Sequence, residues 1–417
     1  MIGEILATGD ELRSGSLIDS NSAYISQKLE ESGLEVTRHS CVGDDLVNLK
    51  NIIKEIGGRA DIAIITGGLG PTTDDLSAEA AALAAGDKLV IFKDALKTIE
   101  SFFLKAGRKM PASNKKQALL PKSAEVILNP VGTAPGFILK LGKCVFFFLP
   151  GVPFEMKKML CDQVLVRIHK LLGNDRQYCL DKTISTFGLP ESTVGEKVAL
   201  VEKKFPGIKL GLRANFPEIQ VKLYAKGASE NGLTDLLNPA AKWVKEQLGK
   251  HIFSMDGYSL EVVIGQLLRE QKASLGIAES CTGGLIANRI TNVAGSSDYF
   301  IFSGVTYSND AKIKVLGVLP ATIEKFGAVA KETVKEMAKG VKDICNATYG
   351  LATTGIAGPS GGSLEKPVGT IWVGLAGPQK IITRQFNFSF GRRLMNKKIF
   401  ASAALDLFRR ELQGVLD

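Results

Sequence analysis

The sequence predicts an α/β protein in which two separate α/β domains, with mostly parallel or mixed sheets, are joined by a small α+β module. Three observations support this fold class. The chain of 417 residues is too long for one ordinary core. Short apolar segments alternate with helical segments in residues 1–170 and again in residues 255–417. The stretch between them, residues 171–254, has a different and smaller pattern.

The first series begins with an apolar strand that ends in glycine, and its next helix is stopped by Gly33. Residues 144–151, CVFFFLPG, form a continuous apolar run that predicts a strand buried on both faces. Repeated βα units predict a parallel sheet with right-handed crossovers. Strands are expected at residues 1–9, 34–43, 60–68 and 144–151, and helices at 20–33, 45–58 and 154–173.

The middle stretch contains no dense polar cluster that suggests chemistry, so we interpret it as a connecting or dimerising module. The second series starts near Leu260 and is not visibly a repeat of the first. It contains a glycine-rich loop after residue 352. Strands are expected at 274–280, 299–308, 349–355, 369–377 and 381–388, and helices at 260–272, 283–295, 309–317, 331–345 and the C-terminus.

Composition narrows the class of protein. The net charge of +9 contains no run of five or six like charges, which favours a solvated surface over a DNA-binding stripe and also suits small anionic substrates. No apolar run reaches 18 residues, and no signal peptide is evident, so neither a membrane span nor secretion is expected. The six cysteines show no CxxC pair or zinc spacing, which indicates reduced thiols and a cytoplasmic location.

The loop AESCTGG around Ser280 lies at the carboxyl end of a predicted parallel strand, where open α/β sheets bind ligands. A serine there can attack an electrophile while free N–H groups at the start of the next helix hold the resulting oxyanion. Ser280 and Thr282 could equally well only cap that helix. On this loop alone, the two interpretations are balanced.

A nucleophilic serine needs a base. None of the three histidines lies in a glycine-rich or strand-end motif, so a Ser-His-Asp triad is poorly supported. A lysine can serve if burial depresses its pKa, and GVTYSNDAK supplies Tyr307 and Lys312 at the next strand end. Taken alone, Lys312 would by default be a surface lysine. Cys281 is a weaker rival nucleophile because no histidine is placed to make a thiolate.

Two glycine-rich loops complete the candidate sites. TTGIAGPSGG at 353–362 could cradle an anion through its backbone, with Arg392 and Arg393 adding counter-charge, although a long flexible turn is the alternative. GGLGPTTDD at 67–75 could cradle a phosphate while Asp74 and Asp75 bind a divalent cation. The alternative for these aspartates is a helix N-cap, and their position directly after the glycines favours ligand binding.

AESCTGG, GVTYSNDAK, TTGIAGPSGG with KPVGTIWVG, and the late GRR occur in an order that resembles the C-terminal domain of the competence/damage-inducible protein CinA family. That domain also occurs alone as a nicotinamide-nucleotide amidohydrolase. The resemblance implies hydrolysis of the carboxamide of nicotinamide mononucleotide to nicotinic acid mononucleotide and ammonia, without a cofactor. It implies Ser280 as nucleophile with Tyr307 and Lys312 as activating partners. It implies substrate binding by Thr282, Gly283, Gly355, Ala357, Gly358 and Arg393.

One departure from the family pattern concerns the phosphate. A second arginine is common four residues after the position of Arg393, and this chain has Lys397 there. A lysine can hold a phosphate as a point charge, with less geometric definition than an arginine.

GDELRSG with SNSAYI, GGLGPTTDD, NKKQALLP, GTAPGF and LPGVPFEMK extend the same resemblance over residues 1–170. This half is similar to the molybdopterin-binding fold of the MoaB/MogA type, which the family links to metal-dependent hydrolysis of ADP-ribose. The resemblance implies a divalent metal such as Mg²⁺ on Asp74 and Asp75. Further positions that it places in the cleft are Asp10, Asn21, Gly67, Gly68, Gly70, Asn114, Lys116, Gln117 and Glu155. Arg13 stands where leucine is more usual.

The middle stretch resembles the family's KH-like connecting domain. The sequence therefore favours a bifunctional enzyme of pyridine-nucleotide salvage in NAD metabolism, with nicotinamide mononucleotide and ADP-ribose as small-molecule partners and a homodimer as the expected assembly. One alternative is a nucleic-acid-binding protein of competence or DNA damage, but no GxxG clamp is evident in residues 174–250. Another makes the N-terminal half a molybdopterin binder without catalysis.

Overall fold

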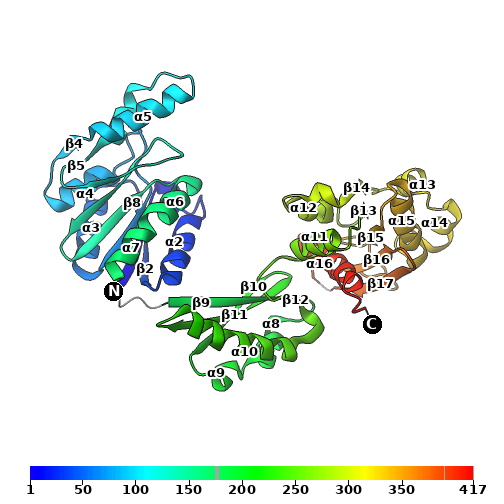
Figure 1. The fold of residues 1–417 in the computed structure, drawn as a ribbon. Coiled ribbons are helices and arrows are strands. Elements are labelled where there is room, and N and C mark those ends of the chain that lie inside the picture. The colour runs from blue at the N-terminus through cyan, green and yellow to red at the C-terminus, as the bar shows by residue number, and fades with distance from the viewer. Residues whose placement is uncertain (174–177, 389, 417) are drawn as a thin grey trace. The chain divides into compact units, whose positions relative to one another are not determined.

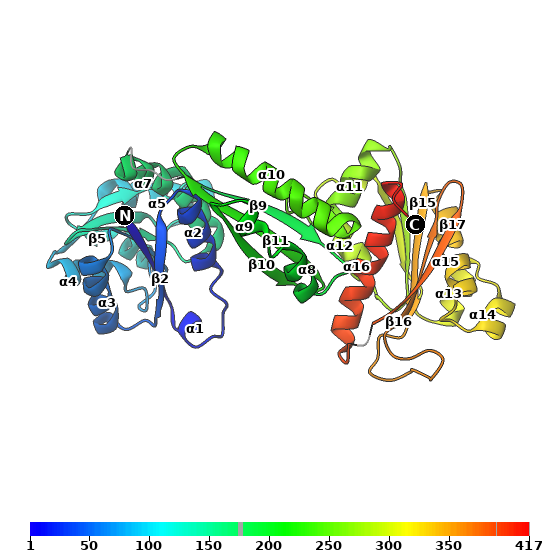
Figure 2. The ribbon, with the colours of Figure 1, turned by 90° about the horizontal axis from the view of Figure 1, so that it is seen from below.

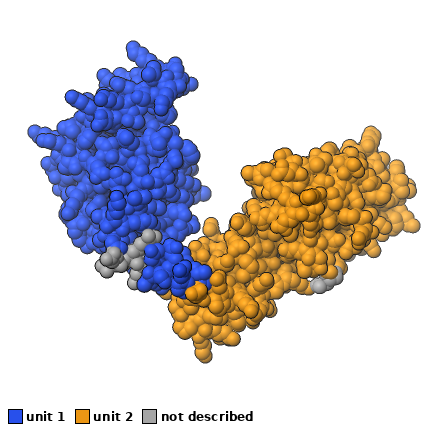
Figure 3. All heavy atoms as spheres, in the orientation of Figure 1, with its two compact units in different colours: residues 1–180, 226–234 blue, residues 181–225, 235–417 orange. Residues whose placement is uncertain are grey.

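The structure, a computed structural model, describes residues 1–173, 178–388 and 390–416. It divides into two compact units, drawn in blue and orange in Figure 3. The first comprises Met1–Leu180 with Lys226–Thr234, and the second comprises Asp181–Ala225 with Asp235–Asp417. Both units are built on α/β architecture, as the sequence predicts.

The first unit contains a six-stranded sheet in the order β2-β1-β3-β8-β7-β6 (Figure 1). β2, β1, β3 and β8 are parallel, which confirms the βα pattern, whereas β7 and β6 are antiparallel and make the sheet mixed. β4 and β5 form a separate antiparallel pair. The strands are β1 (Ile2–Thr8), β2 (Glu35–Val42), β3 (Ile62–Thr66), β4 (Leu89–Ile91), β5 (Leu119–Pro121), β6 (Glu125–Ile127), β7 (Gly136–Leu141) and β8 (Cys144–Leu149).

Successive residues of the central strands face opposite sides of this sheet, so each side has its own core. Ile64 and Phe147 pack with α2, α6 and α7, whereas Ile65 and Phe148 pack with α3 and α4. The predicted strand buried on both faces is therefore confirmed for Cys144–Leu149, whereas Gly151 lies beyond the strand and is exposed. The helices are α1 (Asp10–Arg13), α2 (Ser20–Glu31), α3 (Leu46–Arg59), α4 (Ser77–Ala85), α5 (Lys93–Lys105), η1 (Ala112–Ala118), α6 (Pro153–Met159), the π-helical turn η2 (Leu160–Val164) and α7 (Leu165–Leu172).

The connecting module is α+β, with a four-stranded sheet in the order β10-β11-β9-β12. β10 and β11 form an antiparallel hairpin whose turn is Phe216–Pro217. α8 and α10 lie on the same face of the sheet (Figure 1). The elements are β9 (Tyr178–Thr186), α8 (Glu191–Val198), α9 (Val201–Lys204), β10 (Ile208–Asn215), β11 (Glu218–Gly227), α10 (Glu230–Leu248), η4 (Gly249–His251) and β12 (Ile252–Ser254).

The C-terminal part has a five-stranded sheet in the order β14-β13-β15-β16-β17. β14, β13 and β15 are parallel, and β16 and β17 are antiparallel additions. The carboxyl ends of the three parallel strands therefore meet at one edge. The strands are β13 (Leu275–Glu279), β14 (Phe300–Val305), β15 (Tyr349–Gly355), β16 (Thr370–Ala376) and β17 (Ile381–Asn387).

Helices cover both faces of this sheet. Ile277 and Leu351 share a core with α11, α12 and α16, whereas Ala278 and Ala352 share one with α13 and α15. Figure 2 shows α16, in red, beside the strands. The helices are α11 (Leu260–Glu270), α12 (Leu285–Thr291), η5 (Ser296–Asp298), α13 (Asn309–Leu316), α14 (Pro320–Phe326), α15 (Lys331–Ile344) and α16 (Arg393–Leu412).

α15 approaches the sheet unusually closely because glycines lie beneath it. A Cβ on Gly350 would stand 2.2 Å from the carbonyl oxygen of Ala338, and one on Gly374 would stand 2.5 Å from that of Val334. Only glycine allows this backbone-to-backbone approach. The helix α15 therefore packs directly on the backbone of β15 and β16.

None of the helices in the described part of the chain is long and apolar enough to cross a membrane.

Candidate active sites

Ser280 and Lys312 meet at the carboxyl edge of the C-terminal sheet. Ser280 directly follows β13, and Lys312 lies in the first turn of α13, which follows β14. Lys312 Nζ is 3.2 Å from Ser280 Oγ. The side chain is 1% exposed, so the default interpretation of a surface lysine is wrong. Because β13 and β14 are adjacent and parallel, the segment after β14 brings the amine of Lys312 next to Ser280.

Two backbone carbonyls determine how this lysine is presented to the serine. Lys312 Nζ donates to the carbonyl oxygens of Thr306 and Tyr307 at 2.9 and 3.2 Å. Burial lowers the pKa of Lys312 because the ammonium is removed from water. In the neutral amine, two N–H groups can stay on the carbonyls while the lone pair faces Ser280 Oγ. The arrangement suits a general base.

The start of α12 differs from the expectation of free helical N–H groups. Glu279, which is fully buried, accepts hydrogen bonds from the N–H groups of Ile286 and Ala287 at 3.2 and 2.8 Å. The Glu279 carboxylate thus accepts from N–H groups that were expected to be free to bind an oxyanion. The signal was present in the sequence as the acidic residue before Ser280, but its distance of seven residues from Ile286 concealed the contact.

Tyr307 is placed at the site's mouth. Its side chain is 60% exposed, and its hydroxyl accepts a hydrogen bond from Arg393 Nη2 at 2.9 Å. Arg393 Nη1 also donates to the carbonyl oxygen of Gly358 at 2.7 Å. Tyr307 and Ser280, both described, share no hydrogen bond in this arrangement. The structure therefore brings Tyr307 next to the arginine rather than next to the serine.

The glycine-rich loop after β15 is clamped by the first turn of α16. Asn396, which is fully buried, donates through Nδ2 to the carbonyl oxygens of Ala357 and Phe390 at 3.0 and 2.8 Å. Together with Arg393 on Gly358, it holds two successive loop carbonyls. Asn396 escaped the sequence analysis because a single asparagine in a predicted helix carries no motif.

Small residues hold the two loops together beneath the serine. Thr282 and Thr353 share a hydrogen bond between their hydroxyls at 2.8 Å, and both are fully buried. A Cβ on Gly355 would come within 3.2 Å of Cys281 Sγ. Burial raises the pKa of the Cys281 thiol to about 12, so it stays protonated and is a poor rival for Ser280.

Lys397 lies over the serine loop. A Cβ on Gly283 would be 3.2 Å from Lys397 Nζ, and the backbone of Gly283 has φ +58°. Arg393 and Lys397 stand one turn apart on α16, so both cations face the glycine loops. They can bind an anion there, with the ammonium as a point charge.

The N-terminal loop GGLGPTTDD lines a cleft of about 460 Å³ in the first unit. The cleft lies at the carboxyl ends of β1 and β3, between the loops that follow them and the segment after β8. Its lining includes Asn21, Gly67, Gly68, Gly70, Asp74, Asp75, Gln117 and Glu155. Asp44 and Thr8 also line it, and neither was predicted from the sequence.

Two buried oxygens in this cleft have no hydrogen-bond partner among the described residues, namely Thr8 Oγ1 and Asn21 Oδ1. The amide nitrogen of Asn21 is already used, since it donates to Thr66 Oγ1 and the Gly151 carbonyl at 3.2 and 2.7 Å. Buried polar atoms without partners are costly and call for a ligand or water. The cleft is therefore built to receive polar groups.

The remaining positions that the sequence placed here have supporting contacts. Lys116 Nζ donates to the carbonyl oxygen of Thr72, and Asn114 Nδ2 donates to Gln117 Oε1 at 2.9 Å. Asp10, which was predicted to line the cleft, is not among its lining residues. Neither are Lys116 and Asn114. They hold the acidic loop and Gln117 in position.

Comparison with known proteins places these sites in a family. Residues 4–170 match the model of a probable molybdopterin binding domain, 181–254 that of the damage-inducible protein CinA KH domain, and 257–412 that of the CinA C-terminal domain. The chain is 52% identical over 412 residues to a CinA-like protein of Desulfosudis oleivorans, covering 99% of this chain and 100% of that protein. The chain belongs to the CinA family. A CinA-like protein of Desulforapulum autotrophicum is 48% identical over 413 residues and covers 98% of each chain.

Solved CinA structures resemble part of this chain. The competence/damage inducible protein CihA from Agrobacterium tumefaciens is 36% identical and covers 37% of this chain and 93% of its own, with a TM-score of 0.36. The protein CinA from Thermoplasma acidophilum is 34% identical and covers 40% and 96%, with a TM-score of 0.37.

The carboxylates of the cleft suit a divalent cation in their chemistry. Burial raises the pKa of Asp44, and the charges of Asp10, Glu11 and Asp74 raise it further, so this end of the CinA cleft carries excess negative charge. The carboxylate of Asp75 already accepts a hydrogen bond from Thr72 N at 2.8 Å, which leaves fewer of its lone pairs for a metal. Within the described residues, no three acidic, histidine or cysteine side chains form a ready-made metal cluster. Mg²⁺ needs only one or two carboxylates when phosphates and waters supply the rest.

Proposed function

We propose that this CinA-family chain is a bifunctional enzyme of pyridine-nucleotide salvage. Its C-terminal site hydrolyses the carboxamide of nicotinamide mononucleotide, and its N-terminal site hydrolyses ADP-ribose with a divalent metal. One observation carries the first activity: the buried amine of Lys312 lies 3.2 Å from Ser280 Oγ at the strand edge where α/β sheets bind ligands.

The chemistry follows from that pair. Ser280 Oγ attacks the carboxamide carbon and gives its proton to Lys312 Nζ, whose pKa is lowered by burial, so that the neutral amine that accepts the proton is more abundant than for an ordinary lysine. Lys312 then returns the proton to the amide nitrogen, the C–N bond breaks, and ammonia leaves. Water attacks the resulting Ser280 ester with Lys312 again as base. The products are nicotinic acid mononucleotide and free Ser280.

Arg393 and Lys397 bind the phosphate of the same substrate in this proposal. Arg393 is held by Gly358 and Tyr307, so its guanidinium is already oriented beside the loop. If the phosphate draws Arg393 away, the Tyr307 hydroxyl is released and can turn toward the leaving ammonia. This gives Tyr307 a role that its position at the mouth allows.

The N-terminal activity rests on a different observation, the pair of unpartnered buried oxygens in a cleft rich in carboxylates. Asp74 and Asp75 would hold the metal, which supplies charge neutralisation for a pyrophosphate. Thr8 and Asn21 would bind polar groups of the nucleotide. A molybdopterin binder without catalysis would use the same cleft but would release no AMP from ADP-ribose when metal is added.

The decisive experiment is to incubate the full chain with nicotinamide mononucleotide and measure ammonia. We expect steady release, and we expect Ser280→Ala to lower it by at least about a thousandfold because the nucleophile is lost. The control is Ser101→Ala, at an exposed serine of α5 in the first unit, which does not contain Ser280 or Lys312. Unchanged ammonia release from Ser280→Ala would refute the serine mechanism. Tight, salt-dependent DNA binding without ammonia release would instead favour the nucleic-acid alternative.

A further inference from the structure

Within the second unit, the connecting module contacts the C-terminal part through the turn between β10 and β11, the hairpin tip (residues 215–218). The ring of Phe216 in this tip meets the ring of Phe390 edge to face, with centroids 5.0 Å apart and an interplanar angle of 82°. Phe390 belongs to the segment between β17 and α16, and both rings pack against the core that α11, α12 and α16 share. A side chain of the connecting module therefore contacts the segment that leads into α16.

An ion-pair network fixes the position of the hairpin tip. Glu218 accepts from Arg289 Nη2 of α12 at 2.9 Å, and the same nitrogen also donates to Glu261 of α11 at 2.7 Å. Arg289 Nη1 donates to Ser402 Oγ of α16 at 2.7 Å. None of these three charged side chains is more than 17% exposed. Because a buried network with satisfied partners is rigid in geometry, the tip is fixed relative to all three helices.

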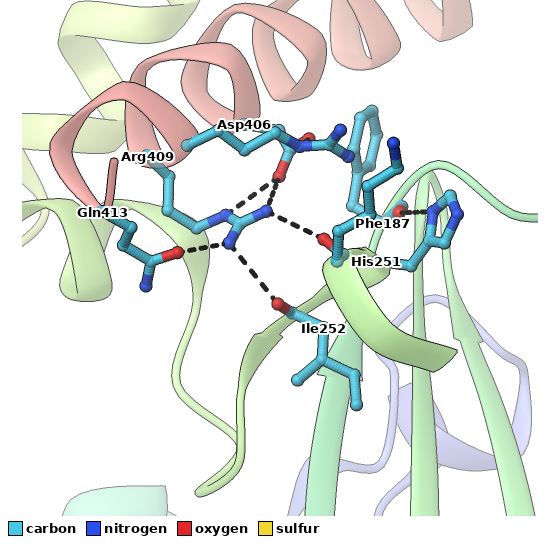
Figure 4. Close-up of polar contacts among 8 residues, drawn as sticks. Phe187, His251, Ile252, Asp406, Arg409 and Gln413 are labelled. Atoms are coloured by element: carbon cyan, nitrogen blue, oxygen red, sulfur yellow. Dashed lines mark hydrogen bonds and ion pairs between the residues drawn. The ribbon is translucent and has the colours of Figure 1, made fainter. Parts of the chain in front are cut away.

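A second junction attaches the module to α16 about two helical turns beyond Ser402. Arg409 is 2% exposed and donates to the carbonyl oxygens of Lys250 and Ile252 at 3.2 and 3.4 Å (Figure 4). Asp406 accepts from two nitrogens of the same guanidinium, at 3.0 and 2.6 Å. Two separated junctions restrict swinging of the module. The contact between the two phenylalanine rings is therefore a fixed feature of this unit.

A single amide group links Phe390 to the glycine-rich loop of the C-terminal site. Asn396 Nδ2 donates to the carbonyl oxygen of Phe390 and to that of Ala357, which lies in the loop. Asn396 is fully buried, and its Oδ1 has no hydrogen-bond partner among the described residues. The orientation of the amide therefore depends on the two carbonyls. If Phe390 moves, a buried N–H loses its acceptor, and the cost of leaving it unpaired drives Asn396 to shift.

We propose that Phe216 is a positioning residue for the C-terminal site. Its ring holds Phe390, the carbonyl of Phe390 holds the amide of Asn396, and this amide holds the glycine-rich loop at Ala357. The inference rests on the proposed amidase function, in which this loop binds nicotinamide mononucleotide. The connecting module then contributes to the substrate affinity of a site in another part of the chain.

The effect is expected on substrate binding rather than on the chemical step. The amine of Lys312 is held by the carbonyl oxygens of Thr306 and Tyr307, so the series of contacts from the hairpin tip does not include the pair that performs the chemistry. A displaced loop weakens binding of the ground state and of the transition state alike. Such a loss raises KM and leaves kcat unchanged.

The first experiment measures kcat and KM for nicotinamide mononucleotide in the full chain. We expect Phe216→Ala to raise KM about fivefold and to change kcat by less than about twofold. Phe216→Leu, which keeps an apolar side chain, should raise KM less. Phe205→Ala is the matched control and should leave KM unchanged. Phe205 also precedes a proline and is half-buried, but its ring lies beside Trp243 within the connecting module.

A cycle of single and double variants tests the path through Phe390. If Phe216 acts through this ring, the KM of Phe216→Ala/Phe390→Ala should match that of Phe390→Ala within about twofold. Increases in KM that multiply in the double variant would overturn the path. An unchanged KM in Phe216→Ala, or an equal increase in Phe205→Ala, would overturn the positioning role.

Hydrogen exchange followed by mass spectrometry tests the loop independently of turnover. The amide of Ile356 donates to the carbonyl oxygen of Thr370 at 2.8 Å, so peptides that contain it report on the loop. These peptides should exchange faster in Phe216→Ala than in the parent or in Phe205→Ala, while thermal unfolding checks that each variant is folded. Equal exchange in all three chains would overturn the proposal. If the parent releases no ammonia, the proposed amidase function fails, and the exchange rates still decide whether Phe216 holds the loop.

Discussion

Lys312 has a buried amine, and the groups around it determine its protonation state. It has two carbonyl acceptors and a serine hydroxyl, and among the described residues no carboxylate is hydrogen-bonded or ion-paired to it. The charged form therefore loses hydration without gaining a full counter-charge, which lowers its pKa. A surface lysine would stay protonated and could not accept the serine proton.

The rate of ammonia release should rise with pH around a midpoint below 10.5, the ordinary pKa of lysine, because burial lowers the pKa of Lys312. The reason is that the neutral amine is the active form, and its fraction grows as pH passes the lowered pKa. A pH profile of kcat/KM measures this directly, and Lys312→Ala should remove the rising limb with most of the activity. A profile in Lys312→Ala with the same limb would assign the titration to another group.

From the residues alone, Ser280 was balanced between nucleophile and cap, and Lys312 was a surface lysine by default. Their 32-residue separation hides the pairing, which depends on β13 lying beside β14. The family resemblance supplied the partnership that local sequence could not. Glu279 and Asn396 were missed for a similar reason, since each acts on backbone groups several residues away and neither belongs to a charged motif.

The serine loop depends on α12 for its shape, and α12 depends on Glu279. The buried carboxylate accepts from two N–H groups of the helix's first turn while its own backbone ends β13. The Glu279 side chain therefore connects the end of β13 to the first turn of α12, across the loop that carries Ser280. The helix start is stabilised by an internal anion.

Glu279→Ala should lower the free energy of unfolding by about 1–3 kcal/mol, because two buried donors lose their acceptor. Glu279→Gln keeps one acceptor oxygen and should have a smaller effect. Urea unfolding followed by Trp372 fluorescence, in a Trp243→Phe background since these are the two tryptophans, measures the change. Equal stability of the alanine variant and its parent would mean that water replaces the carboxylate without loss.

Most elements with strong periodicity were predicted, although the 13-residue helix α5 was not, and strands of three residues were missed. The central strands of both sheets have continuous or alternating apolar residues, and the helices that follow them have clear stops. Residues 86–143, by contrast, contain three strands of three residues each, Leu89–Ile91, Leu119–Pro121 and Glu125–Ile127, besides the six-residue β7. Three residues are too few to show a period of two, so the β4–β5 pair and the edge strand β6 were not predicted.

At the scale of the whole molecule, the two candidate sites belong to different compact units. Asp75 lines the cleft of the first unit, and Ser280 lies in the second. In the contacts described above, no side chain of one site takes part in the other site. Their chemistries also differ, since only the N-terminal cleft is rich in carboxylates.

Asp75→Asn should abolish metal-dependent AMP release from ADP-ribose and leave ammonia release from nicotinamide mononucleotide within about twofold. Removal of metal with EDTA should have the same selective effect on the unsubstituted chain. Parallel assays of both products on each variant, with Ser280→Ala as the reciprocal control, check the separation. If both activities fell together, the two-site proposal would be wrong.

The length of α16 is constrained because side chains at both of its ends must point in fixed directions. Arg393 at its start holds the glycine loop, and Arg409 near its end holds the connecting module. Each inserted residue turns one end of a helix by about 100° relative to the other and adds about 1.5 Å. A single insertion or deletion between these arginines would therefore point one of them away from its carbonyls, whichever residue was added or removed. The number of residues between Arg393 and Arg409 is therefore constrained by contacts at both ends of α16.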